Sequence, residues 1–298
     1  GAPPLRRPQA PFQHLAISRA LGTFSLRLVR QIVEDEHLGR IVYAGGDDVL
    51  ALLSFRDAVP ATRCLRAAFS GQIAPGAERV EVDWGAQTGY VDLDGAPALT
   101  MGPAASASAG IALAHFKHAL SDVVAAAKEA ERYAKDVLGR DHLVLSVLKR
   151  SGEAFMGGVP WTTKAPTDAW LPERVDDLAK AVERYAALVR HGLVSTRLPY
   201  VLAAERTGLD VFEQDTVVGD HDGRAAVLAE VRRLFLRHTE QNGLAVPAPP
   251  DLDWLGSESG WETRAYEATA GLLVRHLRVE QLERLLDAAQ FIGLGGAR

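Results

Sequence analysis

The chain has 298 residues, of which 47% are hydrophobic and 24% charged, so it is long enough to form two globular domains. Its net charge of −5 excludes a chain that is basic throughout and binds nucleic acid generically. The surplus acid lies in the second half: residues 1–150 hold 17 Lys plus Arg against 16 Asp plus Glu, and residues 151–298 hold 16 against 22. A polyanion is therefore expected to contact the first half or a partner subunit.

Neither a membrane span nor a secretion signal is evident. No apolar run approaches the ~18 residues of a membrane helix, and the Pro-rich opening residues lack the apolar core of a signal peptide. The single cysteine, Cys64, excludes an internal disulfide and a Cys-based zinc cluster. We therefore expect a cytoplasmic protein. The opening Gly-Ala-Pro-Pro without a methionine suggests a piece of a longer chain.

In chain order, residues 1–13 are expected to be extended, and apolar residues at helical spacing predict a helix from His14 to Asp35. Gly39 ends this helix. The next predicted elements are a strand at 40–44, a tight turn at Gly45-Gly46, a strand at 48–53 and a helix at 56–69.

Residues 71–104 are rich in Gly, Pro and Ala and predict an insertion or hairpin. The following elements are predicted to be a strand at 106–115, a helix at 120–138 and a closing strand at 141–149. This alternation predicts a sheet covered by helices on one face, close to the order of a polymerase palm.

The second half is predicted to be helical. Residues 151–171, with Gly, Pro and two tryptophans, are expected to form a linker. No fixed repeat period appears, so we expect a small helical bundle rather than a solenoid. The predicted helices span 172–191, 195–207, 222–243, 259–276 and 279–292.

The tetrad Gly45-Gly46-Asp47-Asp48 is the most chemically informative motif. Glycines supply the positive-φ conformations of a tight hairpin. Two aspartates at one edge of a sheet suit a Mg²⁺ site, because Mg²⁺ prefers oxygen ligands and one or two carboxylates per ion can suffice. The alternative is a plain solvent-facing hairpin. The apolar flanking strands predict that the hairpin joins buried strands, which favours the metal site.

Three other segments have two interpretations each. Lys135, late on its helix, could reach a triphosphate or lie on a solvated helix face. The small residues from Ser106 to Gly110 could admit a nucleotide or allow tight helix packing. His115 and His118 lack a third ligand at metal spacing, so structural histidines are favoured. No phosphate-binding Gly-x-x-x-x-Gly-Lys loop, zinc-protease His-Glu-x-x-His or basic stripe interleaved with aromatics occurs.

Four segments together resemble the large subunit of type III CRISPR effector complexes, and the string Tyr-Ala-Gly-Gly-Asp-Asp-Val-Leu-Ala favours the Cmr (III-B) branch. The palm is also similar to that of diguanylate cyclases, which carry a Gly-Gly-(Asp/Glu)-Glu hairpin. The resemblance is sharp over residues 14–150 and weak beyond. Its segments are His14–Phe24, Ile41–Leu52, Ser108–Leu120 and Ala134-Lys135.

The resemblance implies an α/β (α+β) ferredoxin-like polymerase or cyclase palm over 14–150, followed by an all-α helical bundle domain over 172–298. It further implies synthesis of cyclic oligoadenylates from ATP when target RNA is bound. Other effector subunits, guide RNA and target RNA are the implied partners. In this picture Asp47 and Asp48 hold Mg²⁺ or Mn²⁺, and Gly45 and Gly46 admit a phosphate. Lys135 would steady the triphosphate and Ser108 would line the nucleotide pocket.

The departures from the family pattern weaken the catalytic expectation for this chain alone. The nuclease domain, the first palm and the strand with an Asp-Gly-Asp motif, which would precede His14, are missing from the sequence. The isolated chain is therefore expected to make little or no cyclic product. A non-catalytic scaffold is the main alternative, and a diguanylate cyclase is less favoured because it prefers Glu at the position of Asp48.

Overall fold

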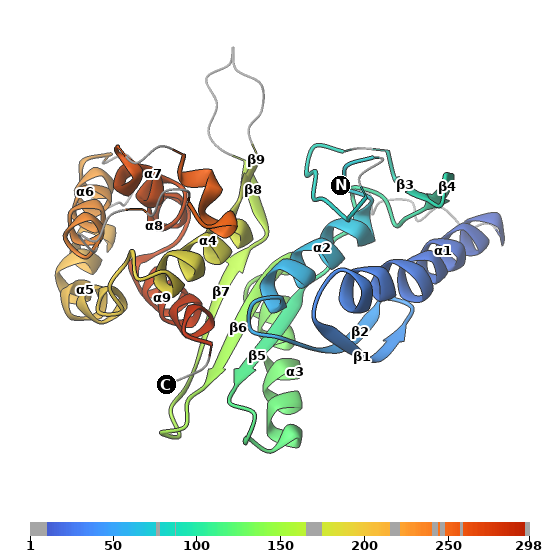
Figure 1. Cartoon of the computed structure of the whole chain (residues 1–298), viewed down its shortest axis with the longest axis horizontal. Helices are drawn as coiled ribbons and strands as arrows, with labels where there is room; N and C mark the ends of the chain where they lie inside the picture. Colours follow the sequence, from blue (N-terminus) through green and yellow to red (C-terminus); the bar gives the residue numbers. More distant parts are fainter. Residues whose placement is uncertain are drawn as a thin grey trace, which may run out of the picture. The chain divides into compact units, whose positions relative to one another are not determined.

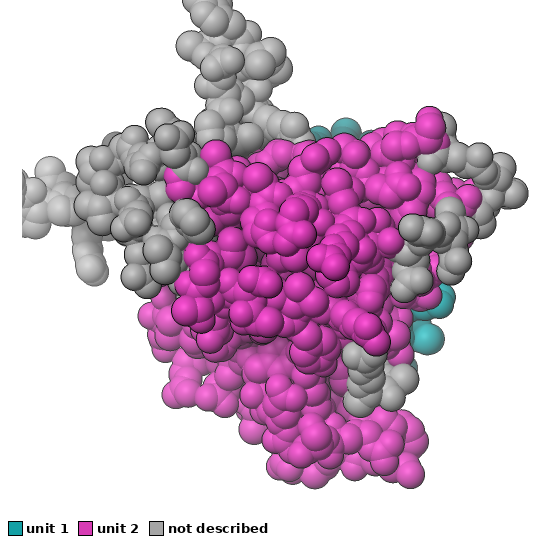
Figure 2. Space-filling model, turned by 90° about the vertical axis from the view of Figure 1, so that its left-hand side faces the viewer, with its two compact units in different colours: residues 1–107 teal, residues 108–298 magenta. Residues whose placement is uncertain are grey.

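The computed structural model describes residues 11–75, 78–86, 88–164, 175–214, 221–239, 244, 248–256 and 259–295. The chain forms two compact units, residues 1–107 and 108–298 (Figure 2). The boundary falls inside the stretch 14–150, which the sequence assigned to one palm domain. Figure 1 gives the order of the elements along the chain.

The first unit begins with the helix predicted for residues 14–35. It starts as α1 (Pro11–Thr23) and continues through two π-helical segments, Phe24–Leu28 and Gln31–Asp35. In each segment a backbone N–H reaches back five residues, as Glu36 N does to Gln31 O at 2.9 Å. Of the expected extended segment 1–13, residues 11–13 are helical and the rest lies outside the described residues.

The predicted hairpin and second helix are confirmed. Strands β1 (Gly39–Gly45) and β2 (Asp48–Leu53) pair antiparallel, and α2 (Ala58–Ser70) ends at Gly71 in the left-handed conformation. The core of this unit joins the π-helical segments to α2 through buried apolar side chains, which are Phe24, Leu28, Val29, Ile32, Val33, Ala61, Cys64, Ala68, Phe69 and Val91.

The region 71–104 contains the hairpin that its composition predicted. Strands β3 (Tyr90–Leu93) and β4 (Ala96–Leu99) pair antiparallel across Asp94-Gly95. Both turn residues have positive φ, 56° and 77°, which is the pattern of a type I′ turn. A separate bridge pairs Ile73 with Val82.

The second unit is built on a three-stranded sheet. Strand β5 (Ala109–Ala114) runs parallel to β6 (His142–Leu148), and α3 (Leu120–Asp136) makes the crossover between them (Figure 1). Strand β7 (Ala154–Pro160) pairs antiparallel with β6. The predicted linker at 151–171 is therefore wrong for β7, whose backbone bonds complete the sheet, and for β8 (Thr162–Lys164), which pairs with β9 (Val175–Asp177).

Helices cover this sheet on both faces, so the predicted one-sided cover is wrong for β5–β7. The helix α3 packs on β5 and β6, whereas α9 (Val279–Gly293) and α4 (Leu178–Arg190) pack on β7 from the other side. Neighbouring glycines of β7 show the alternation: a Cβ at Gly158 would meet Leu138, and one at Gly157 would meet the backbone of Leu285. The side chains of β6 are buried from Leu143 to Val147, which shows that both faces of this strand are covered.

The helices predicted beyond residue 172 are present, and α4 and α9 belong to the same compact unit as the sheet. The region predicted as one helix at 259–276 is split by Thr269, where the backbone leaves helical geometry (φ −132°, ψ −105°). Within the described residues, none of the helices is long and apolar enough to cross a membrane. The remaining helices are α5 (Leu198–Gln214), α6 (His221–Arg237), the 3-10 helix Pro250–Leu255, α7 (Trp261–Glu267) and α8 (Ala270–Val274).

The contact of α3 with β5 gives a first prediction. A Cβ at Gly110 would lie 2.3 Å from Glu131 N and 2.4 Å from Ala127 O, so Gly110→Ala forces the helix away from the strand. We expect it to lower the free energy of unfolding by about 2 kcal/mol, measured by chemical denaturation. The control is Gly208→Ala in α5, where nothing lies within 4 Å of the added Cβ. It should be neutral or stabilise by up to about 1 kcal/mol. Equal effects of the two substitutions would contradict the packing argument.

Candidate metal and nucleotide site

The turn between β1 and β2 displays the two candidate carboxylates. The last residue pair of the hairpin is Gly45 with Asp48, which leaves Gly46-Asp47 as a two-residue loop. Gly46 has φ +62° and Asp47 does not have positive φ, a combination that fits a type II′ turn. Asp47 and Asp48 are adjacent and solvent-exposed, so both are accessible to a cation.

The two glycines of the tetrad have different roles. Only Gly46 needs the positive-φ conformation that the sequence predicted for both. Gly45 is an ordinary strand residue whose hydrogen atom faces the ring of Tyr43, since a Cβ there would lie 2.4 Å from the Tyr43 hydroxyl oxygen. The missing side chain at Gly45 therefore lets Tyr43 lie across the strand, next to the turn.

The strands beside the turn are not buried on both sides as predicted. Their inner face packs on the core through Ile41, Ala44, Val49, Ala51 and Leu53. The other face is open, because Val42 and Tyr43 are each 57% exposed and Leu52 is 45% exposed. The register shifts between Ile41 and Tyr43, which indicates a β-bulge at Val42. An apolar surface therefore lies beside the carboxylates.

The described residues supply only part of a metal site. No group of three His, Cys, Asp or Glu side chains that could hold a metal ion occurs among them. The carboxylate oxygens of Asp47 and Asp48 are hard donors of the kind that Mg²⁺ and Mn²⁺ prefer. Water, substrate phosphates or a further carboxylate from another chain segment would have to complete the coordination.

The other predicted site residues lie in the second compact unit. Ser108 is half-buried and precedes β5, and Lys135 on α3 makes an ion pair with Glu131 at 2.5 Å. Gly110 packs tightly against the backbone of α3, so this position of the small-residue segment allows close helix packing, the second of the two interpretations that the sequence left open. The tetrad and these residues thus come from separate units.

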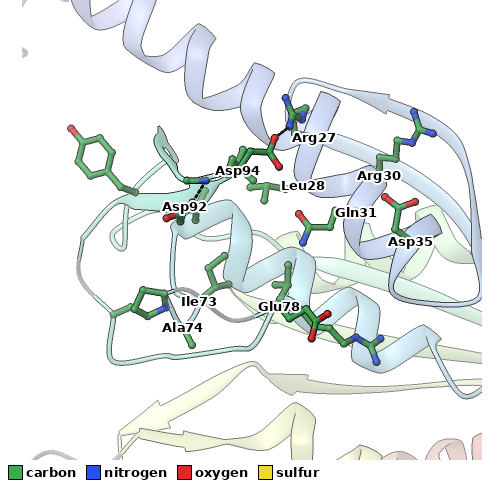
Figure 3. Close-up of a pocket in the computed structure, with 18 of the residues that line it drawn as sticks. Arg27, Leu28, Arg30, Gln31, Asp35, Ile73, Ala74, Glu78, Asp92 and Asp94 are labelled. Atoms are coloured by element: carbon green, nitrogen blue, oxygen red, sulfur yellow. Dashed lines mark hydrogen bonds and ion pairs between the residues drawn. The ribbon is translucent and has the colours of Figure 1, made fainter.

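A separate groove of about 700 Å³ lies in the first unit (Figure 3). Its walls are the two π-helical segments and the chain from Ile73 to Gly95, and the tetrad is not part of its lining. Arg27 and Asp94 form an ion pair in this lining, and the Arg79 guanidinium donates a hydrogen bond to the backbone carbonyl of Glu36. Sequence reasoning missed the groove because its lining comes from three separate segments that share no motif.

The hairpin and its supporting helices define the class of protein. A β-hairpin with exposed paired aspartates at its turn, between two helices in the sequence, has the local order expected of part of a palm domain. Residues 5–144 match the sequence model of the family described as Cas10/Cmr2, second palm domain. Over about half of its length the chain is therefore similar to the large subunit of type III-B CRISPR effector complexes, which confirms the resemblance noted in the sequence.

Two individual proteins show the extent of the similarity. The CRISPR system Cmr subunit Cmr2 of Pyrococcus furiosus is 36% identical over 152 residues, which are 51% of this chain and 15% of that protein. The type III-B Cmr-beta structure in its apo state aligns with a TM-score of 0.54 and 18% identity, over 81% of this chain and 23% of that one. The second comparison supports the fold alone, and this chain spans a small part of either relative.

The turn geometry gives a second prediction. Gly46→Ala places a side chain at φ +62° and should cost about 1 kcal/mol of unfolding free energy, and Gly46→Asn should cost less because Asn tolerates this conformation. Gly45→Ala is the comparison, since there the exposed Tyr43 ring can rotate away. Chemical denaturation of the three variants measures these differences. A larger loss for Gly45→Ala than for Gly46→Ala would contradict the assigned turn.

Proposed function

We propose that this chain contributes a palm domain to the large subunit of a type III-B CRISPR effector complex in the cytoplasm. In this proposal the palm takes part in the metal-dependent synthesis of cyclic oligoadenylates from ATP when target RNA is bound. Other effector subunits are its direct partners, and guide and target RNA are reached through the complex. The exposed Gly46-Asp47-Asp48 turn in a Cas10/Cmr2-type palm is the observation that carries the proposal.

The proposed chemistry follows from the residues at the turn. Asp47 and Asp48 would hold Mg²⁺ or Mn²⁺, which supplies charge neutralisation at the phosphates and lowers the pKa of a coordinated hydroxyl. Gly46 carries no side chain, and nothing lies within 4 Å of the position where its Cβ would be, so a phosphate can approach the backbone there. Ser108 and Lys135 keep their proposed roles toward the nucleotide and its triphosphate. For Lys135 this requires exchange of its exposed pairing with Glu131.

A scaffold function is the second candidate. It is favoured by one observation, that the described residues provide two carboxylates at the turn and no third ligand group. In that case the chain holds neighbouring subunits in place without turnover. Diguanylate cyclase activity is less favoured, because Asp48 stands where such enzymes prefer glutamate.

The decisive experiment uses the effector complex assembled around this chain with guide RNA and matching target RNA. The complex is incubated with ATP and Mg²⁺ or Mn²⁺, and cyclic oligoadenylates are quantified by liquid chromatography and mass spectrometry. Replacing Asp47 and Asp48 together by Asn should lower the rate of product formation more than about 100-fold, because metal stabilisation of the transition state is worth several kcal/mol.

The matched control is Asp94→Asn, which removes an exposed carboxylate from another hairpin turn of the same unit. It should leave the rate unchanged. Product formation that survives the double substitution would overturn the site assignment. Absence of product from the intact complex, with normal assembly, would support the scaffold function. The isolated chain should yield little or no product under the same conditions.

A further inference from the structure

Two loops of the second unit meet at one end of its sheet. Strands β5 and β6 are parallel and pair up to Ala114 with Leu148, so their carboxyl ends coincide. The chain leaves β5 through His115-Phe116-Lys117-His118, and it leaves β6 through the turn that begins at Lys149-Arg150 (Figure 1). We call His115, Phe116, Lys117, His118 and Arg150 the strand-end cluster.

The strand-end cluster carries unneutralised positive charge. Lys117 and Arg150 are exposed. Among the described residues, no carboxylate lies within ion-pair distance of either side chain. The neighbouring acid Glu153 is paired with Lys149 at 3.2 Å, and Asp122 accepts a hydrogen bond from Ser121 at 3.2 Å. Desolvation lowers the pKa of His115, and the positive charges of Arg150, Lys117 and His118 lower it further.

An aromatic ring projects from the same loop. Phe116 is 85% exposed, the highest value among the large hydrophobic side chains that the structure describes as exposed. Its ring lies against His115, with centroids 4.4 Å apart and an interplanar angle of 34°, and Lys117 Nζ lies 5.8 Å from its centroid. The loop is itself held in shape, because Lys117 N donates to His115 Nδ1 at 3.2 Å and His118 N donates to His115 O at 2.9 Å.

We propose that the strand-end cluster binds single-stranded nucleic acid, with Phe116 stacking on a base and Lys117 and Arg150 contacting the flanking phosphates. An exposed aromatic ring beside unpaired cations is the arrangement by which proteins bind single strands. The second unit, residues 108–298, holds 23 Lys plus Arg against 27 Asp plus Glu, so it is acidic overall and a polyanion is favoured at this patch rather than across the unit. The inference does not depend on the cyclase proposal.

Two other occupants fit less well. A metal ion would need a third ligand beside His115 and His118, and no such group occurs among the described residues. A protein partner would gain from the exposed phenyl ring but would have to neutralise or leave buried the charges of Lys117 and Arg150. Phosphates supply that neutralisation and leave the ring free for a base.

The test uses the full chain and fluorescence anisotropy with a fluorescein-labelled oligouridylate of about 12 nucleotides at about 50 mM salt. We expect Lys117→Glu combined with Arg150→Glu to weaken binding more than tenfold and to reduce the slope of log affinity against log salt by about 2. Phe116→Ala should weaken binding about tenfold, and Phe116→Tyr should retain it. Oligothymidylate of the same length, run in parallel, distinguishes RNA from DNA.

The controls match each substitution in kind. Arg232→Glu on the exposed face of α6 makes the same charge change as Arg150→Glu, and Phe12→Ala removes another exposed phenyl ring. Both should bind like the unmodified chain, and thermal unfolding of every variant checks the fold. Failure of the unmodified chain to bind either oligonucleotide would overturn the proposal. So would equal binding by the cluster variants, or tighter binding of duplex that does not depend on Phe116.

Discussion

The close approach of α3 to β5 is the constraint on which the second unit depends. The backbone of α3 lies so near Gly110 that no side chain fits between them. This contact fixes β5 against its crossover helix, and the helix returns the chain to β6 in parallel register. Because β6 is then central and buried on both faces, β7 pairs with its second edge and α9 covers the face opposite α3. The glycines of β7 permit close contact on both faces, with α9 at Gly157 and with Leu138 at Gly158.

The same geometry decides where exposed side chains that could bind a ligand lie in that unit. Parallel strands place their carboxyl ends together, so the loop after β5 and the turn after β6 share one end of the sheet. In the helices and strands around the sheet, the backbone groups form hydrogen bonds and the apolar side chains pack in the core. Side chains that take no part in either, such as Phe116 and Arg150, project from these loops.

The first unit places two like charges side by side at the turn of a hairpin. A two-residue turn with Gly46 at φ +62° brings Asp47 and Asp48 to the tip of a hairpin whose inner face is anchored in the core. Both carboxylates remain exposed, so neither bears the cost of burying an unpaired charge. The outer face, with Val42, Tyr43 and Leu52, stays open beside them.

The sequence by itself determined the local features of this protein: the β1–β2 hairpin, the helices α2, α3 and α9, and the tetrad that identifies the palm. Each depends on spacing, turn chemistry or a short motif, and these are local properties of the chain. Only the tertiary structure decided that residues 154–160 form a strand, that Gly110 serves packing, and that the turn at Arg150 shares one end of the sheet with the loop at Phe116. The physical reason is that each of these features depends on another segment of the chain: β7 on β6, Gly110 on α3, and the turn at Arg150 on the loop after β5. A Gly-rich segment such as β7 becomes a strand because β6 offers it hydrogen bonds, and its own composition does not signal this.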